Sequence, residues 1–307
     1  MKTLLIVGVE TVVGANLAAC WSETARVFGL SVGPEIEIAG CQTAVCERTS
    51  ADSVRRWIQQ VHPQQVIYCG AAARSAWEGS AKTSEDGAAE TWATAAAQNG
   101  IHFTLISSDA IFTGPWMYHD EDSRTFCDSP EARAIRETEA RVQAACPKSL
   151  IIRSNAFGWS ARKSGGWLES LIAGLESNRA IELDPIGHAS PILASDLADY
   201  LEAALEDELT GVFHVAGAER ISSHQFLVGL ARAFELNAQT PKTIRELADR
   251  PTGFARGETS LNTKRFCVEY DCAMPLLSEG IERLVEQHRS GYRDRLSGSA
   301  MPSGKAA

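Results

Sequence analysis

The segment from Gly8 to Gly14 has the residue types of a turn that holds a phosphate group against the start of a helix. It reads Gly-Val-Glu-Thr-Val-Val-Gly, and such a turn needs glycine wherever a Cβ would keep backbone N–H groups from a pyrophosphate. Thr11 replaces the middle glycine of a GxxGxxG spacing and narrows that space, and Glu10 adds a negative charge beside it. Two interpretations follow. Gly8, Thr11 and Gly14 bind a dinucleotide, or the two glycines only allow a strand and a helix to pack closely.

The rest of a nucleotide site would come from the ends of the next strands. Ser31 lies near the tip of the second expected strand, where an acidic residue would bind the ribose 2′-hydroxyl of NAD. Because Ser31 is neither acidic nor basic, the choice between NAD and NADP stays open. Gly70 and Ala71 follow the expected strand over residues 65–68 and complete the candidate cofactor-binding set.

Four further side chains are candidates for binding a substrate. Arg74, Trp77 and Tyr118 follow strand ends, where ligands bind in doubly wound sheets, and His188 lies in a later loop. An arginine among aromatic rings suits an anionic or planar ligand. Aromatic packing explains the aromatic residues at least as well, and a histidine that faces solvent is the alternative for His188.

A metal site is not expected from the cysteines. Eight are scattered along the chain without CxxC spacing: Cys20, Cys41, Cys46, Cys69, Cys127, Cys146, Cys267 and Cys272. Reduced thiols and a cytoplasmic protein are the simplest interpretation. The first residues also lack the cleavage pattern of a signal peptide.

An alternation of strands and helices must position these residues. Residues 3–7 are a continuous apolar run, typical of a parallel strand buried on both faces. Further strands are expected over residues 27–32, 65–68, 102–106, 150–153 and 212–215, and helices over 15–22, 50–61, 83–99, 129–145, 167–177, 195–205 and 223–234. The repeated units predict an α/β fold, a Rossmann-like doubly wound parallel sheet with a small C-terminal substrate lobe. We expect the nucleotide-binding core over 1–158, the lobe, with returns to the core, over 159–288, and a disordered end over 289–307.

Composition excludes several classes of protein. Of 307 residues, 44% are hydrophobic and 22% are charged, which is the usual globular mixture. No apolar run approaches the roughly 20 residues that span a bilayer. The formal net charge is −10, with 29 basic and 39 acidic side chains, whereas nucleic-acid binding usually needs a basic face. We therefore expect a small-molecule substrate and no nucleic-acid or membrane partner, and homodimer formation is left open.

Six segments carry a resemblance to one protein family. Residues 106–114 (ISSDAIFTG) resemble its strand and loop ISTDYVFDG, and residues 150–154 (LIIRS) resemble its LIIRTS strand. The others are residues 118–122, 187–198, 210–217 and 261–265. The chain resembles the dTDP-4-dehydrorhamnose reductase family, within the extended short-chain dehydrogenase/reductase (SDR) superfamily, from residue 1 to about residue 288. The resemblance implies the Rossmann-like fold and an NAD(P) site.

Reductases of this superfamily use a Ser or Thr hydroxyl and a YxxxK pair. The tyrosine gives a proton to the carbonyl oxygen, and the lysine lowers the tyrosine pKa and holds the nicotinamide ribose. The resemblance places Ser108 at the hydroxyl, Glu131 at the tyrosine and Ile135 at the lysine. If the alignment slips by one residue, Ala132 takes the tyrosine position and Arg136 the lysine position. That restores the positive charge of the lysine but not the acid. The pair is missing, so we expect NAD(P) binding to be weak or absent.

Without that pair, the leading interpretation is a divergent SDR-fold enzyme that acts without hydride transfer on a small biosynthetic intermediate. Glu131 would be the general base or acid in a proton abstraction, elimination or isomerisation, and Ser108 would hold the oxyanion. The alternative for Glu131 is a solvated glutamate in the first turn of a helix. Two other functions stay open: a catalytically silent binding or regulatory subunit, and an NADP-dependent reductase of a nucleotide-ketosugar with a substitute acid.

Overall fold

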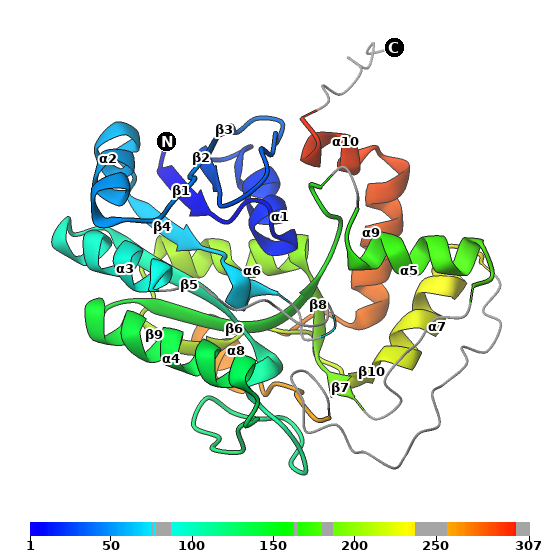
Figure 1. Ribbon diagram of the computed structural model, residues 1–307. Helices are drawn as coiled ribbons and strands as arrows, with labels where there is room; N and C mark the ends of the chain where they lie inside the picture. The colour runs from blue at the N-terminus through cyan, green and yellow to red at the C-terminus, as the bar shows by residue number, and fades with distance from the viewer. Residues whose placement is uncertain (75–76, 78–86, 163–164, 180–186, 237–256, 299–307) are drawn as a thin grey trace.

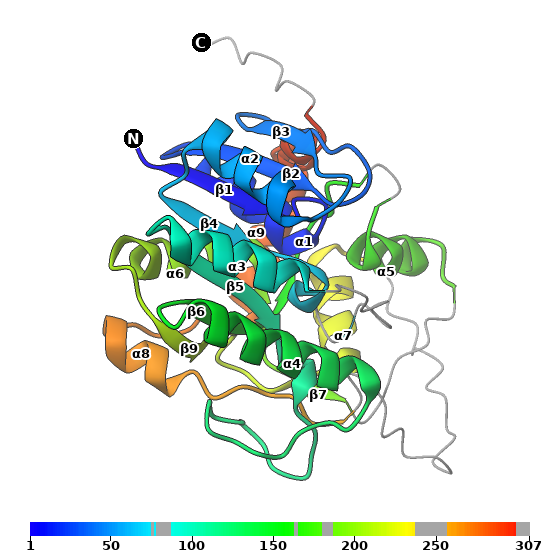
Figure 2. The same ribbon diagram turned by 60° about the vertical axis from the view of Figure 1, so that its left-hand side comes forward.

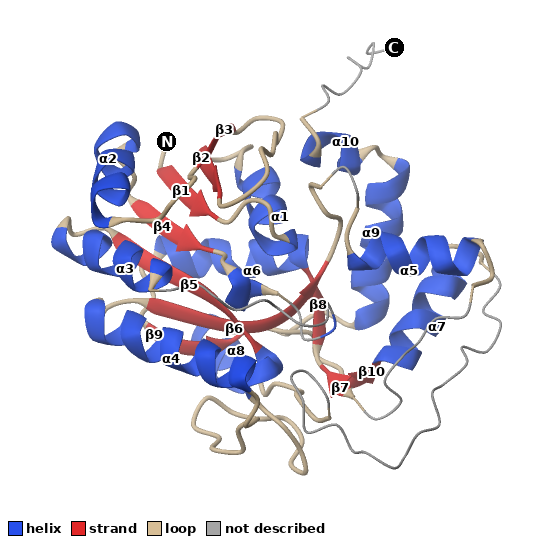
Figure 3. Ribbon diagram, viewed as in Figure 1, coloured by secondary structure: helices blue, strands red, loops and turns tan. Residues whose placement is uncertain are grey.

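The fold is built around one parallel sheet. A computed structural model describes residues 1–74, 77, 87–162, 165–179, 187–236 and 257–298. Seven strands follow the order β3-β2-β1-β4-β5-β6-β8, and β9 also pairs with β6. Their bounds are β1 Thr3–Val7, β2 Arg26–Ser31, β3 Gln42–Val45, β4 Gln65–Tyr68, β5 His102–Ser108, β6 Leu150–Phe157, β8 Pro191–Leu193 and β9 Gly211–His214. Because these pairings are parallel, the carboxyl ends of β1, β4, β5 and β6 meet at one edge of the sheet (Figure 3).

Helices cover both faces of the sheet because alternate side chains of its buried strands point in opposite directions. Leu5 and Val7 of β1 face α2 (Ala51–Val61), α3 (Ala88–Gln98) and α4 (Pro130–Ala145), which lie side by side (Figure 2). Leu4 and Ile6 belong to the other core, with α1 (Val12–Trp21) and α6 (Ala194–Glu206). The predicted doubly wound, Rossmann-like sheet is confirmed.

The chain after residue 158 divides between a smaller lobe and the main sheet. α5 (Trp167–Glu176), α7 (Ser223–Ala233) and α9 (Leu277–Arg289) lie together to one side of the sheet (Figure 1). Below them, β7 (His188–Ala189) and β10 (Ile221–Ser222) form a short antiparallel pair. The strands β8 and β9 return to β6, and α8 (Lys264–Tyr270) packs against β9.

The disordered end that we expected from residue 289 is not found over residues 290–298. These residues contain a short helix, α10 (Tyr292–Leu296), which packs against α1. Leu296 is fully buried, and the Tyr292 hydroxyl donates to Asn16 Oδ1 at 3.1 Å. The partner lies near the other end of the sequence, so no local pattern predicts this burial. Residues 299–307 lie outside the described residues.

Several observed elements differ from the expected ones, and β7, β8, β10, α8 and α9 were not predicted. The edge strand β3 was not predicted, and α1 begins at Val12, inside the expected turn, because Thr11 is its N-cap. The helix expected over 83–99 is described as α3 from Ala88, and residues 83–86 lie outside the described residues.

Candidate functional site

The glycine turn and the start of α1 form one hydrogen-bonded unit. The Thr11 hydroxyl donates to the Gly8 carbonyl oxygen at 2.7 Å and accepts from the Gly14 N–H at 3.0 Å. These are the bonds of an N-cap. We expected the Thr11 side chain to narrow the space for a pyrophosphate, but its hydroxyl is directed into the helix cap.

Close backbone packing requires both glycines of the turn. A Cβ on Gly8 would lie 2.1 Å from the Cys69 carbonyl oxygen, and one on Gly14 would lie 2.2 Å from the Gly8 carbonyl oxygen. The N–H groups of Val12 and Val13, in the first turn of α1, have no hydrogen-bond partner within the described part of the chain. Such N–H groups at a helix N-terminus bind phosphate oxygens. The turn therefore fits the pyrophosphate of a dinucleotide as well as serving packing.

Two polar residues lie at the carboxyl end of β2. One carboxylate oxygen of Glu10 accepts a hydrogen bond from the Val32 N–H at 3.1 Å, so this side chain reaches across to the neighbouring strand. Ser31, which we expected near the ribose, is buried and donates its hydroxyl proton to the Pro34 carbonyl oxygen. Glu10, rather than Ser31, therefore places a charged group at the tip of β2.

Gly70 and Ala71 lie next to the glycine turn. Gly70 follows β4 and precedes the short helix η1 (Ala71–Ala73), and its nitrogen is 3.4 Å from the Cβ position of Gly8. The structure therefore brings together the residues predicted from two separate strand ends.

The residue that the resemblance places at the lysine position of the YxxxK pair is buried in an apolar cluster. Ile135 is 3% exposed and packs with Ala72, Ile111, Phe112, Ala216 and Leu261. Glu131 lies one turn earlier on α4, is half-buried, and follows the N-cap Ser129. Residues four apart share one face of a helix. This face of α4 therefore carries a half-buried carboxylate one helical turn from a buried isoleucine.

Ser108 ends β5 and holds the turns around it. Its Oγ is 3.1 Å from the Arg74 carbonyl oxygen and 3.3 Å from Asp109 Oδ1, and it accepts from the Ala110 N–H at 3.1 Å. The residue is fully buried. Because a hydroxyl has one proton to donate, Ser108 must leave both of these acceptors before it can donate to an oxyanion.

Sequence reasoning missed a buried carboxylate beside Ser108. Asp109 Oδ2 accepts from Asn155 Nδ2 at 2.8 Å and from the Thr259 hydroxyl at 2.6 Å. The carboxylate thus joins the ends of β5 and β6 to a segment 150 residues away. Asp109 lies within the segment 106–114 that resembles the family, which could have marked it as a candidate. Its hydrogen-bond partners could not be predicted from the sequence.

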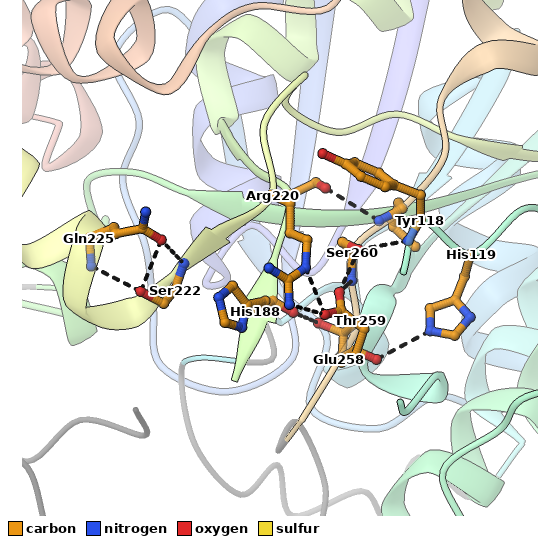
Figure 4. A network of polar contacts seen from close by, with 11 residues as sticks. Tyr118, His119, His188, Arg220, Ser222, Gln225, Glu258, Thr259 and Ser260 are labelled. Atoms are coloured by element: carbon orange, nitrogen blue, oxygen red, sulfur yellow. Dashed lines mark hydrogen bonds and ion pairs between the residues drawn. The ribbon is translucent and has the colours of Figure 1, made fainter. Parts of the chain in front are cut away.

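The segment Glu258–Ser260 connects two of the predicted substrate-binding residues (Figure 4). Ser260 accepts from the Tyr118 N–H at 2.8 Å, and the Thr259 N–H donates to the His188 carbonyl oxygen at 2.9 Å. Glu258 is buried and forms an ion pair with Arg220. Tyr118 itself is 45% exposed and has a positive φ of 55°. The segment therefore holds Tyr118 and His188 in one polar network.

Trp77 and Arg74 lie in different surroundings, although both follow β4. The Trp77 ring is 5.2 Å from the Phe226 ring and 6.0 Å from the Trp167 ring, between centroids. Aromatic packing with the small lobe thus accounts for much of its surface. Arg74 is half-buried, and its guanidinium has no partner within the described part of the chain.

A second buried polar network lies between α4 and the sheet. Arg153 donates from Nε and a terminal nitrogen to the Glu139 carboxylate at 3.0 and 2.7 Å, and Ser107 donates to the same carboxylate at 2.6 Å. His214 Nε2 is 3.4 Å from Arg153. Burial, and then the nearby guanidinium, lower the pKa of His214 to about 3.

The described residues contain neither a cluster of metal ligands nor a membrane-spanning helix. No group of three or more His, Cys, Asp or Glu side chains is placed to hold a metal ion. No described helix is both long enough and apolar enough to cross a membrane.

The parallel sheet and the glycine turn define a protein with a Rossmann-like fold. Comparison with known families then makes the assignment specific. The chain belongs to the RmlD substrate binding domain family, whose model matches residues 1–290.

Individual relatives are distant. The chain is 24% identical over 218 residues to the dTDP-4-dehydrorhamnose reductase of Salmonella typhimurium, covering 64% of this chain and 69% of the relative. It is 24% identical over 203 residues to methionine adenosyltransferase 2 subunit beta of Danio rerio, covering 62% of each. The Bacillus anthracis dTDP-4-dehydrorhamnose reductase, solved in complex with NADP, has a TM-score of 0.75 at 18% identity and covers 94% of this chain and 99% of its own.

These comparisons confirm the predicted family resemblance and fold. They also show that the fold can hold a nicotinamide cofactor, because the Bacillus anthracis structure contains NADP. The curated relatives are matched over less than three-quarters of their lengths.

Proposed function

We propose that the chain is a divergent enzyme of this family that acts without hydride transfer on a small biosynthetic intermediate. The observation that carries the proposal is the packing of Ile135 in an apolar cluster, with the Glu131 carboxylate one helical turn away. An isoleucine can neither lower the pKa of a neighbouring acid nor bind a ribose. A carboxylate can remove or return a proton next to a carbonyl group. The proposed reaction is a proton abstraction, elimination or isomerisation.

Other residues of the site would bind the substrate and its developing charge. The Ser108 hydroxyl contacts the backbone carbonyl oxygen of Arg74, so the two residues are neighbours, and the Arg74 guanidinium would bind an anionic group of the substrate. Tyr118 and His188, which are held by hydrogen bonds to the segment 258–260, would contact the rest of the substrate. Ser108 would stabilise an oxyanion after its hydroxyl turns away from Arg74 and Asp109.

A nicotinamide cofactor, when bound, supplies or accepts a hydride. The glycine turn fits the pyrophosphate, whereas Ile135 leaves the nicotinamide ribose without its usual anchor. We propose that NAD(P)(H) binds more weakly than ~100 μM, because each lost charged hydrogen bond weakens binding by about 1.5–3 kcal/mol. The protein is proposed to be cytoplasmic and free of structural metal.

A binding or regulatory subunit is the second candidate. Two observations favour it: the Ser108 hydroxyl is engaged in the turns around it, and the chain resembles methionine adenosyltransferase 2 subunit beta. An orthodox reductase of a nucleotide-ketosugar with a substitute acid is the third candidate, supported by the similarity to dTDP-4-dehydrorhamnose reductase.

Replacing Glu131 in the native host separates these candidates. The strain would carry Glu131→Gln, with Glu137→Gln as a matched control on the exposed side of α4. Metabolites that accumulate on deletion of the gene should also accumulate with Glu131→Gln and not with the control. Normal metabolite levels in the Glu131→Gln strain would reject the proposed role and favour the regulatory candidate. Consumption of NADPH with nucleotide-ketosugars would favour the reductase.

A further inference from the structure

We infer that Glu10 selects which nucleotide this fold accepts. Its carboxylate favours an adenine dinucleotide with a free ribose 2′-hydroxyl and disfavours one with a 2′-phosphate. The inference concerns the adenosine end of the nucleotide site and does not depend on the role of Glu131.

The backbone fixes Glu10 at the tip of β2. The N–H groups of Gly8 and Val9 donate to the Leu30 carbonyl oxygen at 2.7 and 3.2 Å, which fastens the turn to the end of that strand. The next residue, Glu10, then accepts from the Val32 N–H through Oε2. In doubly wound folds the adenosine ribose lies at the end of the second strand, where a carboxylate accepts from its 2′-hydroxyl. Here the carboxylate comes from the glycine turn instead of the strand.

The second carboxylate oxygen of Glu10 is available for a ligand. Within the described part of the chain, the only hydrogen bond to the Glu10 carboxylate comes from the Val32 N–H, which donates to Oε2. Glu10 is half-buried, and Oε1 has no hydrogen-bond partner among the described residues, so we infer that it would accept from the ribose hydroxyl. Ser31, the other polar side chain at this tip, is held by the Pro34 carbonyl oxygen and cannot take the same role.

The surrounding charges act against a 2′-phosphate. Arg162 donates to the Glu10 carbonyl oxygen at 3.3 Å and lines a groove of about 530 Å³ after β2. Glu35 and Glu37 line the same groove. Among the described residues, the half-buried Glu10 carboxylate repels a phosphate placed here most strongly, because solvent screens the exposed Glu35 and Glu37. A neutral 2′-hydroxyl avoids that repulsion and gains the Glu10 hydrogen bond.

Calorimetric titration with matched pairs of ligands tests the inference. The pairs are NAD with NADP, and ADP-ribose with 2′-phospho-ADP-ribose, each titrated to about 5 mM. The member with the free hydroxyl should bind at least ~10-fold more tightly in each pair, since like charges at close range disfavour the wrong ligand. Equal affinities, tighter binding of the 2′-phosphates, or no binding of any of the four would overturn the inference.

Two variants assign the effect to Glu10. Glu10→Gln keeps an oxygen that accepts from Val32 but removes the charge, so the ratio within each pair should fall to about threefold or less. Glu35→Gln removes the same charge from an exposed position on the same groove. Solvent screens that charge, and the ratio should change by less than about twofold. An unchanged ratio in Glu10→Gln, or an equal loss in Glu35→Gln, would refute the assignment, provided that thermal unfolding shows both variants folded.

Discussion

The guanidinium of Arg153 in β6 binds the carboxylate of Glu139 in α4 through two donors, at 3.0 and 2.7 Å, and both side chains are less than a tenth exposed. This bidentate pair fixes α4 against the sheet. Because Glu131 and Ile135 lie on the same helix, the pair also sets their positions. Its proper geometry is therefore a condition for any chemistry at Glu131.

Glu139→Ala should strongly destabilise the protein. The substitution leaves the Arg153 charge buried without its partner, and loss of one member of a buried pair costs about 3–5 kcal/mol. Urea denaturation of the purified protein measures the free energy of unfolding. Glu137→Ala, which removes an exposed pair with Arg141, should cost less than about 1 kcal/mol. Equal losses in the two variants would show that the buried pair has no special role.

Glu131→Gln should reduce activity with little effect on stability. The amide keeps the size of the side chain but cannot accept the proton, so turnover should fall by about 10²–10⁴-fold. The free energy of unfolding should change by less than ~1 kcal/mol, because a first-turn glutamate contributes only an interaction with the helix dipole. Steady-state kinetics on the accumulated intermediate, paired with urea denaturation, checks both. Full activity would remove Glu131 from the mechanism.

Ser108→Ala separates a structural role of the hydroxyl from a catalytic one. The hydroxyl caps the turn that follows β5, so its loss should cost about 1 kcal/mol of unfolding free energy whatever the function. If Ser108 also holds the oxyanion, kcat should fall by more than tenfold while KM stays within about twofold. A stability loss with unchanged kcat would leave Ser108 as a positioning residue.

Restoring the reductase pair should not create a reductase. Ile135→Lys would put an ammonium group among the apolar side chains around Ile135, at a cost of about 3 kcal/mol or more. Ile135→Leu is the control and should cost less than about 1.5 kcal/mol. The double variant Glu131→Tyr/Ile135→Lys would be assayed by NADPH oxidation with a nucleotide-ketosugar. Turnover at ordinary reductase rates would mean that the apolar cluster opens to accept the lysine.

His214 should make stability fall as the pH is lowered. Its pKa is about 3 in the folded protein, below the ordinary value of 6.5, because burial and Arg153 disfavour the charged ring. The unfolded chain therefore binds more protons than the folded protein as the pH drops below 6.5. For this group, the free energy of unfolding falls by at most about 1.4 kcal/mol per pH unit. Urea denaturation at several pH values from 7 to about 4 should give a steeper loss for the native protein than for His214→Gln. Parallel curves would contradict the assignment.

The sequence was sufficient to predict the central sheet but not its margins. The buried strands β1 and β4 are short, mostly apolar runs, and their alternation with helical segments indicates a parallel sheet. The edge strand β3, Gln42–Val45, is half-buried and carries no comparable run. The helix α10 contains only two buried residues, and its stability depends on contacts with α1.

Within the site, sequence spacing located the positions but not the directions of the side chains. Glu131 and Ile135 both lie on α4, one helical turn apart, as the spacing predicts, and their match to the tyrosine and lysine positions stays a prediction. The orientation of Thr11 and Glu10 depends on hydrogen bonds to the helix cap and to Val32, which a linear pattern does not encode. Asp109 was overlooked for the same reason, since Asn155 and Thr259 come from distant parts of the chain.

The bond between Tyr292 and Asn16 joins residues separated by 276 positions, and it has a consequence for the order of folding during synthesis. Asn16 is fully buried, and its side-chain amide oxygen lacks this partner until the ribosome has made α10. At about 5–20 residues per second, that delay is about 14–55 s. The polar contacts of α1 are thus completed only after residue 292 has been made. The Asn16 side chain, two residues after the glycine turn, therefore gains its last partner only when α10 has folded.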